Sequence, residues 1–265
     1  MDLFNPQHMN KKLNSYFWFI FLPAHIFLIV SIMKITIDLS SILVLLLFWT
    51  LISGYGIGVA FHRLLSHNSF KTWPIIETVI SYFGCLAIQG SPIFWVNIHR
   101  GYHHPYSDTA KDIQSPIHGK LWSYFLWSVQ VNYRDLKYNS VFRLMRKKDQ
   151  LFLHNYYFPI IWITWITVYA ISPQIFYIVV IAQIISLHLE FMVSLFCHSK
   201  GGYRNFDTKD NSVNYYLFGL LCWGIGYHNN HHARPQSYDF GYKRFEFDPA
   251  TVLVHLIKKG DDASL

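Results

Sequence analysis

Nine histidines in this chain fall into three tight groups and one single position. The stretches "HRLLSH", "HRGYHH" and "HNNHH" carry eight of them, and "LFCHSKGGY" carries the ninth. These residues are His62, His67, His99, His103, His104, His198, His228, His231 and His232. Neutral imidazole is a favoured ligand of iron, copper, zinc and nickel. Because nine ligands exceed the capacity of one ion, the set predicts two metal ions with four or five histidines each.

Helical geometry makes a prediction for the third group and for the first. At 100° per residue, His231 and His232 lie about 60° behind and 40° ahead of His228, so all three face one way like a metal-binding claw. His62 and His67 are five residues apart, or about 140° around a helix. We therefore expect these two to reach different ions.

The second group needs a local distortion. His99, His103 and His104 would spread over about 140° in an unbroken α-helix. Gly101 lies between them, and glycine lets a backbone bulge at modest cost. We expect a helix irregularity of the π-bulge kind near Gly101 that returns His99 to the metal site.

The elements that carry these groups are predicted to be membrane helices. The chain is 52% hydrophobic and 14% charged, whereas a soluble protein is about 25% charged. A span needs about 20 mostly apolar residues. Four runs qualify, and short turns pair them into two hairpins: 16–33 with 40–59, and 156–171 with 174–196. A weaker apolar stretch, 74–94, is expected to form a short interfacial or partly inserted helix.

Basic residues predict the orientation of these spans. Of the 22 Lys and Arg, two precede the first span, eleven lie between the hairpins and eight follow the last. One lies in the first hairpin turn and none in the second. By the positive-inside rule both termini and the histidines are cytoplasmic. Topogenesis and anionic lipid headgroups account for the net charge of +7, so no nucleic-acid partner is needed.

The predicted fold class is an all-α integral membrane protein. Four transmembrane helices in two hairpins carry a cytoplasmic helical cap with a histidine-ligated two-metal site, in one domain over residues 1–265. Three cysteines make no CxxC pair, which argues against a disulfide scaffold. The N-terminus has no signal-peptide pattern.

The three groups resemble the histidine boxes of the membrane-bound fatty acid desaturases, most closely the stearoyl-CoA (Δ9) desaturase branch. "GVAFHRLLSHNSFKTW" is similar to the first-box region, "FWVNIHR" keeps a Trp before the second, and "SLFCHSKGGYRNF" is similar to the segment with an extra histidine. "GYHNNHHARPQSYDFGYKRFEFDP" is similar to the third box and the acidic stretch after it. The likeness covers residues 58–248.

The resemblance implies an enzyme with two iron ions, held by the nine histidines, that uses O2 as co-substrate. It implies insertion of a cis double bond, at Δ9, into a saturated long acyl chain. The chain would be carried by CoA, a lipid or acyl-carrier protein, and a separate ferredoxin or cytochrome b5 would supply electrons, since no HPGG motif is present. The favoured location is a bacterial inner membrane, with the endoplasmic reticulum as alternative.

Other functions remain open at this point. The same scaffold could support hydroxylation, or formation of an acetylenic bond or a terminal alkene. A metal transporter would hold its ligands near the bilayer midplane, whereas these histidines gather at one membrane boundary.

The chain also departs from the family pattern. The second box has one residue more than the usual H-x-x-H-H, and Ser194 stands where an Asn is usual. A "GEG" before the third box has Ile225 at its acidic position, and a "DPH" is here "DIQ". Asn97-Ile98 replaces the Arg-Asp pair of animal members, which weakens the case for a CoA handle and leaves other acyl carriers open.

Two polar residues of the last predicted span are candidates for contact with the site. Glu190, Ser194 and His198 follow each other at intervals of four residues, on one helical face. Glu190 would lie about 12 Å along the axis from His198, too far to share a metal, so we expect it and Ser194 to support the ligands or line the substrate cavity. The alternative is that Glu190 is protonated or pairs with His25 or His188.

Overall fold

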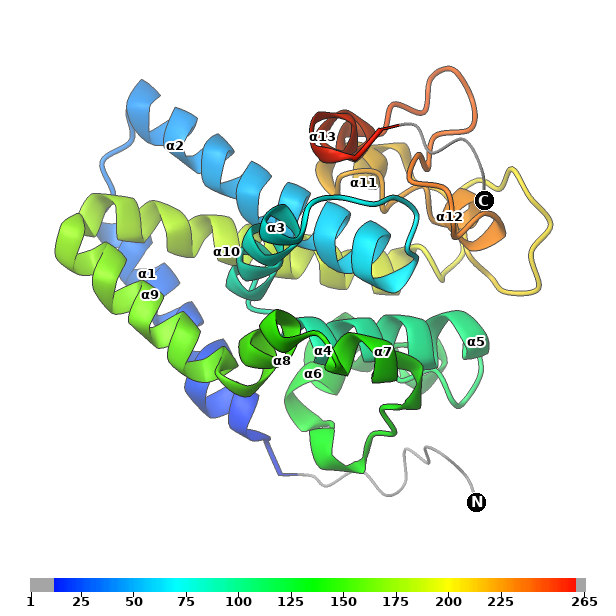
Figure 1. The fold of residues 1–265 in the computed structure, drawn as a ribbon, viewed down its shortest axis with the longest axis horizontal. Coiled ribbons are helices and arrows are strands. Elements are labelled where there is room, and N and C mark those ends of the chain that lie inside the picture. Colours follow the sequence, from blue (N-terminus) through cyan, green and yellow to red (C-terminus); the bar gives the residue numbers. More distant parts are fainter. Residues whose placement is uncertain (1–11, 261–265) are drawn as a thin grey trace.

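The computed structural model describes residues 12–260, and this part of the chain is helical, with two isolated β-bridges and no strand (Figure 1). Residues 1–11 and 261–265 lie outside the described part, and with them the predicted cytoplasmic placement of both termini. The longer helices are α1 (Leu22–Lys34), α2 (Leu39–Trp49), η3 (Thr50–Ser66), α3 (Pro74–Leu86), α8 (Lys148–Asn155), α9 (Tyr157–Ile171), α10 (Pro173–Phe196) and α13 (Pro249–Ile257).

Shorter helical segments fill the connections. They are η2 (Phe17–Phe21), α4 (Pro92–Val96), η4 (Asn97–His103), α5 (His104–Tyr106), η5 (Pro116–His118), η6 (Trp122–Leu126), α6 (Trp127–Gln130), η7 (Tyr133–Asp135), η8 (Asn139–Val141), α7 (Phe142–Met145), α11 (Tyr216–Leu221) and α12 (His228–Ala233). Of these, η2, η4 and η6, like η3, have π-helical hydrogen bonding between residue i and residue i+5.

Three continuous helices are long and apolar enough to cross a membrane. They are Phe17–Lys34, Leu39–Ser66 and Pro173–Phe196. The predicted spans 16–33 and 174–196 are confirmed as helices. The span predicted over 40–59 is longer than expected, because α2 continues without a break into η3 and carries the helix through the first histidine group. Apolar side chains exposed on α1 and α2, such as Ile32 and Leu43, suit contact with lipid.

The helix predicted over 156–171 is present but short. As α9, it has 15 residues and extends about 22 Å, less than the roughly 30 Å of a bilayer core. The stretch over 74–94 forms two helices and not one, since α3 ends at Leu86 and α4 begins at Pro92.

The two helical hairpins lie with their turns together. The Gln174 side chain accepts from the Thr36 backbone N–H (3.3 Å) and donates to the Thr36 carbonyl (2.7 Å) and to Ser41 Oγ (3.2 Å). Asp38 caps α2 through Ser41 N, and Ser172 caps α10, so each turn also begins a helix. In Figure 1 both turns lie at the left, and the other end of the bundle is formed by the end of η3, α5, α12 and the end of α10.

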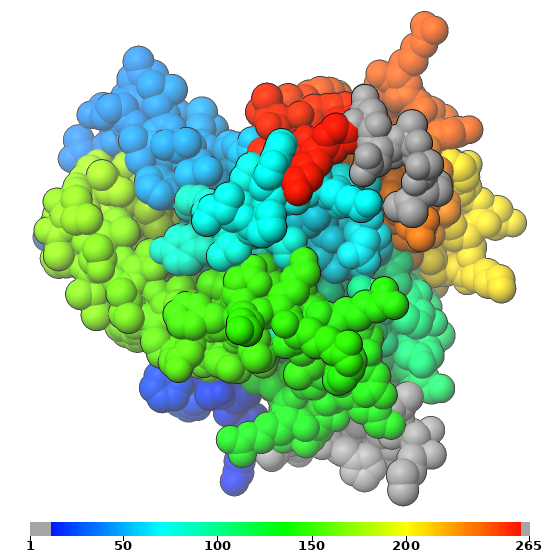
Figure 2. All heavy atoms as spheres, viewed as in Figure 1, coloured from blue at the N-terminus to red at the C-terminus, as the bar shows by residue number. Residues whose placement is uncertain are grey.

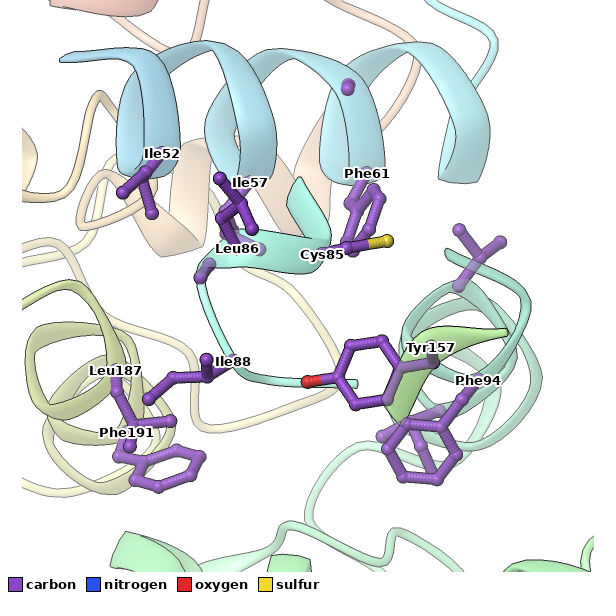
Figure 3. Close-up of a cluster of buried hydrophobic side chains, with 14 of the residues drawn as sticks. Ile52, Ile57, Phe61, Cys85, Leu86, Ile88, Phe94, Tyr157, Leu187 and Phe191 are labelled. Carbon is purple, nitrogen blue, oxygen red and sulfur yellow. The ribbon is translucent and has the colours of Figure 1, made fainter. Parts of the chain in front are cut away.

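Close packing joins η3 to α3. A Cβ on Gly56 would lie 2.6 Å from the Gly84 backbone N, and one on Gly84 would lie 2.5 Å from the Phe61 ring, so both positions require glycine. Figure 3 shows Phe61 reaching down to Cys85 of α3 within the buried core. This contact fixes the part of η3 that carries the first histidine group.

The segment between the hairpins packs onto the same frame. On the face in Figure 2, α3 and α8 lie against each other. Lys147 Nζ donates to Glu77 Oε1 (2.6 Å) and Thr78 Oγ1 donates to Asp149 Oδ2 (2.8 Å). The two helices that flank the segment with the second histidine group, α3 and α8, are thus joined to each other.

Candidate metal centre

The structure brings all nine singled-out histidines together in two clusters. The five-histidine cluster contains His62, His67, His99, His104 and His231. The four-histidine cluster contains His103, His198, His228 and His232. Within each cluster the candidate ligand atoms lie within 4.8 Å of one another. The predicted division into four and five ligands is therefore present in the geometry.

Four separate segments supply these side chains at one end of the bundle. The end of η3 supplies the first group, and η4 with α5 supplies the second (Figure 1). His198 follows the last turn of α10, and α12 carries the third group. No two neighbouring elements could complete either cluster alone, so the clusters depend on the whole fold.

The prediction that His62 and His67 reach different ions is wrong, since both belong to the five-histidine cluster. The 140° separation assumed an α-helix, but η3 is π-helical and the His67 N–H donates to the His62 carbonyl (3.2 Å). In π-helical geometry residue i+5 is the hydrogen-bonded neighbour of residue i, one turn further along. The two rings therefore point to the same place, with centroids 5.2 Å apart.

The irregularity predicted near Gly101 is confirmed. The second group lies on η4, a π-helix over Asn97–His103, and the His104 N–H donates to the His99 carbonyl. This places His99 and His104 one turn apart, in the five-histidine cluster, while His103 turns to the four-histidine cluster. The extra residue in "HRGYHH" is thus absorbed by a wider helical turn.

Gly101 itself is needed for close approach. A Cβ there would lie 2.6 Å from Ser140 Oγ and 3.0 Å from Asn97 Oδ1, two atoms that share a 2.6 Å hydrogen bond. We expect Gly101→Val to lower the free energy of unfolding by about 1–3 kcal/mol through overpacking. Thermal unfolding in detergent measures this, and Ser140→Gly in the same chain should recover much of the loss. A valine variant as stable as the original chain would contradict the role of this contact.

The third group divides between the clusters. His228 and His232, four residues apart on α12, belong to the four-histidine cluster, and His231 belongs to the other. The three rings do face the site together, as the helical arithmetic predicts. The three histidines of this group are therefore shared between the two clusters, and they do not all belong to one site.

The ring nitrogens of the four-histidine cluster are arranged for a cation. Three Nδ1–H groups donate to carboxylates: His103 to Asp112 (3.0 Å), His198 to Asp108 (3.1 Å) and His232 to Asp210 (2.8 Å). The fourth, on His228, donates to the Ile225 carbonyl (3.2 Å). In a neutral ring, each Nε2 then carries an unshared lone pair.

These lone pairs converge. His228 Nε2 lies 2.9 Å from that of His198, 3.1 Å from that of His232 and 3.4 Å from that of His103. Two ligands about 2.1 Å from one metal lie roughly 3.0 Å apart at a right angle and 3.4 Å apart at a tetrahedral angle. The cluster therefore fits one metal ion.

In the five-histidine cluster the Nε2 atoms have similar spacing, but fewer of the Nδ1 atoms have hydrogen-bond partners. Its Nε2 atoms approach at 2.9–3.0 Å in the pairs His67–His99, His99–His104, His104–His231 and His62–His231. The Nδ1 atoms of His62 and His231 are buried without a hydrogen-bond partner in the described part of the chain. This cluster also fits one metal ion, but its rings are less firmly held.

Burial keeps most of these imidazoles neutral. It lowers the pKa well below the ordinary value for His99, His104, His228, His231 and His232, and lowers that of His67 to about 3. For His103, burial is outweighed by the Asp112 carboxylate, which raises the pKa. Neutral imidazole is the form that binds a metal.

A cavity lies beside both clusters. Its wall includes His62 and His99 of one cluster and His103 and His228 of the other. The remaining lining residues are Gln89, Phe94, Trp95, Ile98, Gln114, Trp127, Glu190, Phe191, Val193, Ser194 and Ile225. A second cavity adjoins it and shares Gln89 and Phe94. An apolar chain in the first cavity would therefore lie next to the histidines.

Glu190 and Ser194 both line the metal-side cavity, and neither belongs to a cluster. Glu190 is 8% exposed, and its Oε1 has no hydrogen-bond partner in the described part of the chain. His25 and His188 bond to each other at 3.0 Å, so the alternative pairing with Glu190 is absent.

Four tryptophans of the chain differ in their relation to the metal-side cavity. Trp95 and Trp127 line the cavity, whereas Trp122 and Trp223 do not. The Trp95 ring stacks on His99 with centroids 5.0 Å apart, and its Nε1 donates to Gln89 (3.1 Å). Trp95 thus holds a cavity wall and a cluster ring together.

Sequence analysis missed the carboxylates behind the histidines. Asp108, Asp112 and Asp210 lie in loops, 90, 9 and 22 residues along the chain from the histidines that they support, which are His198, His103 and His232. It also missed Asp248, which forms a fully buried 2.7 Å ion pair with Arg63 of the first group. The only signal was that "HRLLSH" contains an Arg and the tail contains "FEFDP".

Comparison with known proteins gives a consistent result. The fatty acid desaturase family model matches residues 40–245. An acyl-CoA C20 Δ5-desaturase of Anemone leveillei is 32% identical over 209 residues, which cover 77% of this chain and 66% of that protein. Δ9 acyl-lipid desaturase 2 of Arabidopsis thaliana is 30% identical over 230 residues, 83% of this chain and 72% of that protein.

A protein of Nostoc is similar to the same degree. The sn-2 palmitoyl-lipid 9-desaturase of Nostoc sp. (strain 36) is 31% identical over 222 residues, 82% of this chain and 77% of that protein. The aligned region spans 58–66% of the length of the Anemone leveillei and Limnanthes douglasii acyl-CoA 5-desaturases.

Proposed function

This chain belongs to the fatty acid desaturase family, and on that basis we propose that it is an O2-dependent membrane desaturase that inserts a cis double bond, at Δ9, into a saturated acyl chain. The observation that carries the proposal is the pair of histidine clusters on the wall of one cavity. Relatives whose names specify acyl-CoA and acyl-lipid substrates support an acyl chain on one of these carriers.

The nine histidines would hold two iron ions, since imidazole suits iron and the two clusters supply nitrogen ligands alone. When bound, iron would supply the O2-dependent oxidising power that side chains lack for an unactivated acyl chain. The electrons are proposed to come from a separate ferredoxin or cytochrome b5.

The cavity residues would position the acyl chain. Phe94, Trp127 and Phe191 offer apolar surface, and the chain's depth between them would decide which carbons face the clusters. The same walls would exclude water from the reacting carbons. Regioselectivity is therefore a property of the cavity walls and not of the ligands.

The proposed membrane arrangement has four spans, with α9 completing the second hairpin and the histidine end on the cytoplasmic side. The Lys and Arg distribution supports this orientation. The remaining helices would form the cytoplasmic cap. A bacterial inner membrane is the favoured location and the endoplasmic reticulum the alternative.

Glu190→Gln tests whether the buried carboxyl group acts in the cavity. We expect the variant to keep the metal content of the original chain, because no Glu190 atom belongs to either cluster. We expect a several-fold lower kcat/KM, because the carboxyl lines the cavity beside the histidines. Metal analysis and acyl turnover, measured together, check both parts. Unchanged turnover would assign Glu190 to packing alone.

The proposed reaction is tested by the lipid profile of a host with simple lipids that expresses the chain. Mass spectrometry is expected to show a new monoene with its double bond at Δ9. A hydroxylated, acetylenic or terminal-alkene chain would instead assign another oxidation to this scaffold. Zinc in the purified protein with no acyl product would favour the transporter alternative.

A further inference from the structure

The two clusters differ in what lies behind their histidines. Three of the four Nδ1–H groups in the four-histidine cluster donate to carboxylates, those of Asp108, Asp112 and Asp210. In the part of the chain that the structure describes, no carboxylate accepts from a ring of the five-histidine cluster. This difference lies in the protein's own residues, on the far side of each imidazole from the position that an ion would take.

The three carboxylates are fixed independently of any metal. Asp108 Oδ2 accepts from the Asn211 backbone N–H (2.6 Å), Asp112 Oδ1 from that of Gln114 (3.0 Å), and Asp210 Oδ1 from that of Ser212 (3.0 Å). Asp108 also has a φ of +61°. Residues other than glycine keep such a conformation where surrounding structure enforces it, often at functional sites. The rings of the four-histidine cluster are therefore oriented in advance.

Charge acts in the same direction. A divalent ion among four neutral imidazoles gains three negative charges one ring away, and each carboxylate also increases the basicity of its ring. An ion among the other five rings has no such compensation, and two of those rings have a buried Nδ1 with no partner. The fifth imidazole adds one bond from a neutral ligand. We take its contribution to metal affinity to be smaller than that of three carboxylates.

We propose that the clusters bind metal unequally and in order: the four-histidine cluster fills first and holds its ion tightly, while the five-histidine cluster fills second and exchanges its ion. Asp108, Asp112 and Asp210 are the positioning residues that create this order. The inference rests on the proposed function only in requiring that the clusters bind metal, and the reaction itself is not needed for it.

The test is a titration of the full-length, chelator-stripped protein with cobalt(II), followed by bound-metal analysis and absorption spectroscopy. We expect a tight first equivalent with the intense bands of four-coordinate cobalt, then a weaker second equivalent with the fainter bands of higher coordination. Two equivalents of equal affinity, or a first equivalent with the higher-coordinate spectrum, would overturn the proposal.

Variants assign each event to a cluster. Asp112→Asn and Asp210→Asn should raise the dissociation constant of the first event about 10–100-fold and leave the second within about two-fold. Asp207→Asn, a change at an exposed carboxylate in the same loop as Asp210, is the matched control and should change neither. His67→Ala should remove the second event and keep the first.

Thermal unfolding of the metal-free variants separates metal binding from folding, and Asp108→Asn replaces any variant that does not fold. Equal weakening of both events by the Asp variants would refute the order. A chain that binds cobalt in the proposed order but, with iron and an electron donor, oxidises no acyl chain would refute the proposed function and leave this inference standing.

Discussion

His103→Ala is expected to abolish formation of the new unsaturated acyl chain. The substitution removes one of four ligands from its cluster and leaves the Asp112 carboxylate buried without its imidazole partner. Since side chains alone cannot oxidise an unactivated chain, activity should fall to the level of the host without the gene. The lipid profile measures this, and metal content should fall from two ions to about one per chain.

His255→Ala is the matched control, because His255 is exposed and belongs to neither cluster. It should leave both the product and the metal content unchanged. If the His103 variant still made the product at the normal rate, the four-histidine cluster would not be part of the active site.

Asp248→Asn is expected to destabilise the whole fold. Arg63 is fully buried and donates to Asp248 Oδ2 (2.7 Å), to the Tyr238 carbonyl (2.7 Å) and to the Gly58 carbonyl (2.6 Å). Its pairing with Asp248 joins η3 to the segment that begins α13. Removing one charge of a buried pair costs about 3–5 kcal/mol, because the other charge is left uncompensated. Thermal or chemical unfolding in detergent should show a large loss.

Asp248 uses one carboxylate oxygen to accept from Arg63 and the other to accept from the Ala250 backbone N–H, which caps α13. Asn has a single acceptor oxygen, so the variant removes the charge together with one of these two hydrogen bonds. Asp207→Asn again serves as the comparison, since it removes an exposed charge. Its free energy of unfolding is expected to be within about 0.5 kcal/mol of that of the original chain. An Asp248 variant with unchanged unfolding would show that the ion pair does not hold η3 against the tail.

Hydropathy was sufficient to predict the helices that form the frame. The apolar runs at 16–33 and 174–196 correspond to helices because nothing in them interrupts the pattern. The run at 40–59 was predicted too short, since the helix continues through residues such as His62 and Arg63, whose polarity ends a hydropathy signal. Their burial depends on contacts with the tail, which hydropathy does not report.

The nine histidines and their division into sets of four and five could be predicted from the sequence, but the assignment of each histidine to one cluster or the other could not. An angle of 100° per residue holds for an α-helix, and η3 and η4 are π-helical. In the second group, the extra residue itself signalled a distortion. In the first group the number of residues was ordinary, so nothing in "HRLLSH" indicated that His67 would return to the side of His62.

The supporting carboxylates could not be predicted because they come from loops. Asp108 reaches His198, which is 90 residues away along the chain, and Asp248 reaches Arg63 across 185 residues. No periodic pattern connects such pairs. They exist only after the two hairpins and the tail have packed, which is why the structure was needed to separate the two clusters.

The most direct test of the account is the metal content of the purified, full-length chain after expression in iron-replete medium. The predicted result is two iron atoms per chain. Treatment with chelator should remove both of them and should at the same time abolish O2-dependent formation of the unsaturated acyl product. A chain that takes up only one metal ion even with excess iron, or zinc in place of iron in a protein that retains full activity, would contradict the assignment of nine histidines to two iron ions.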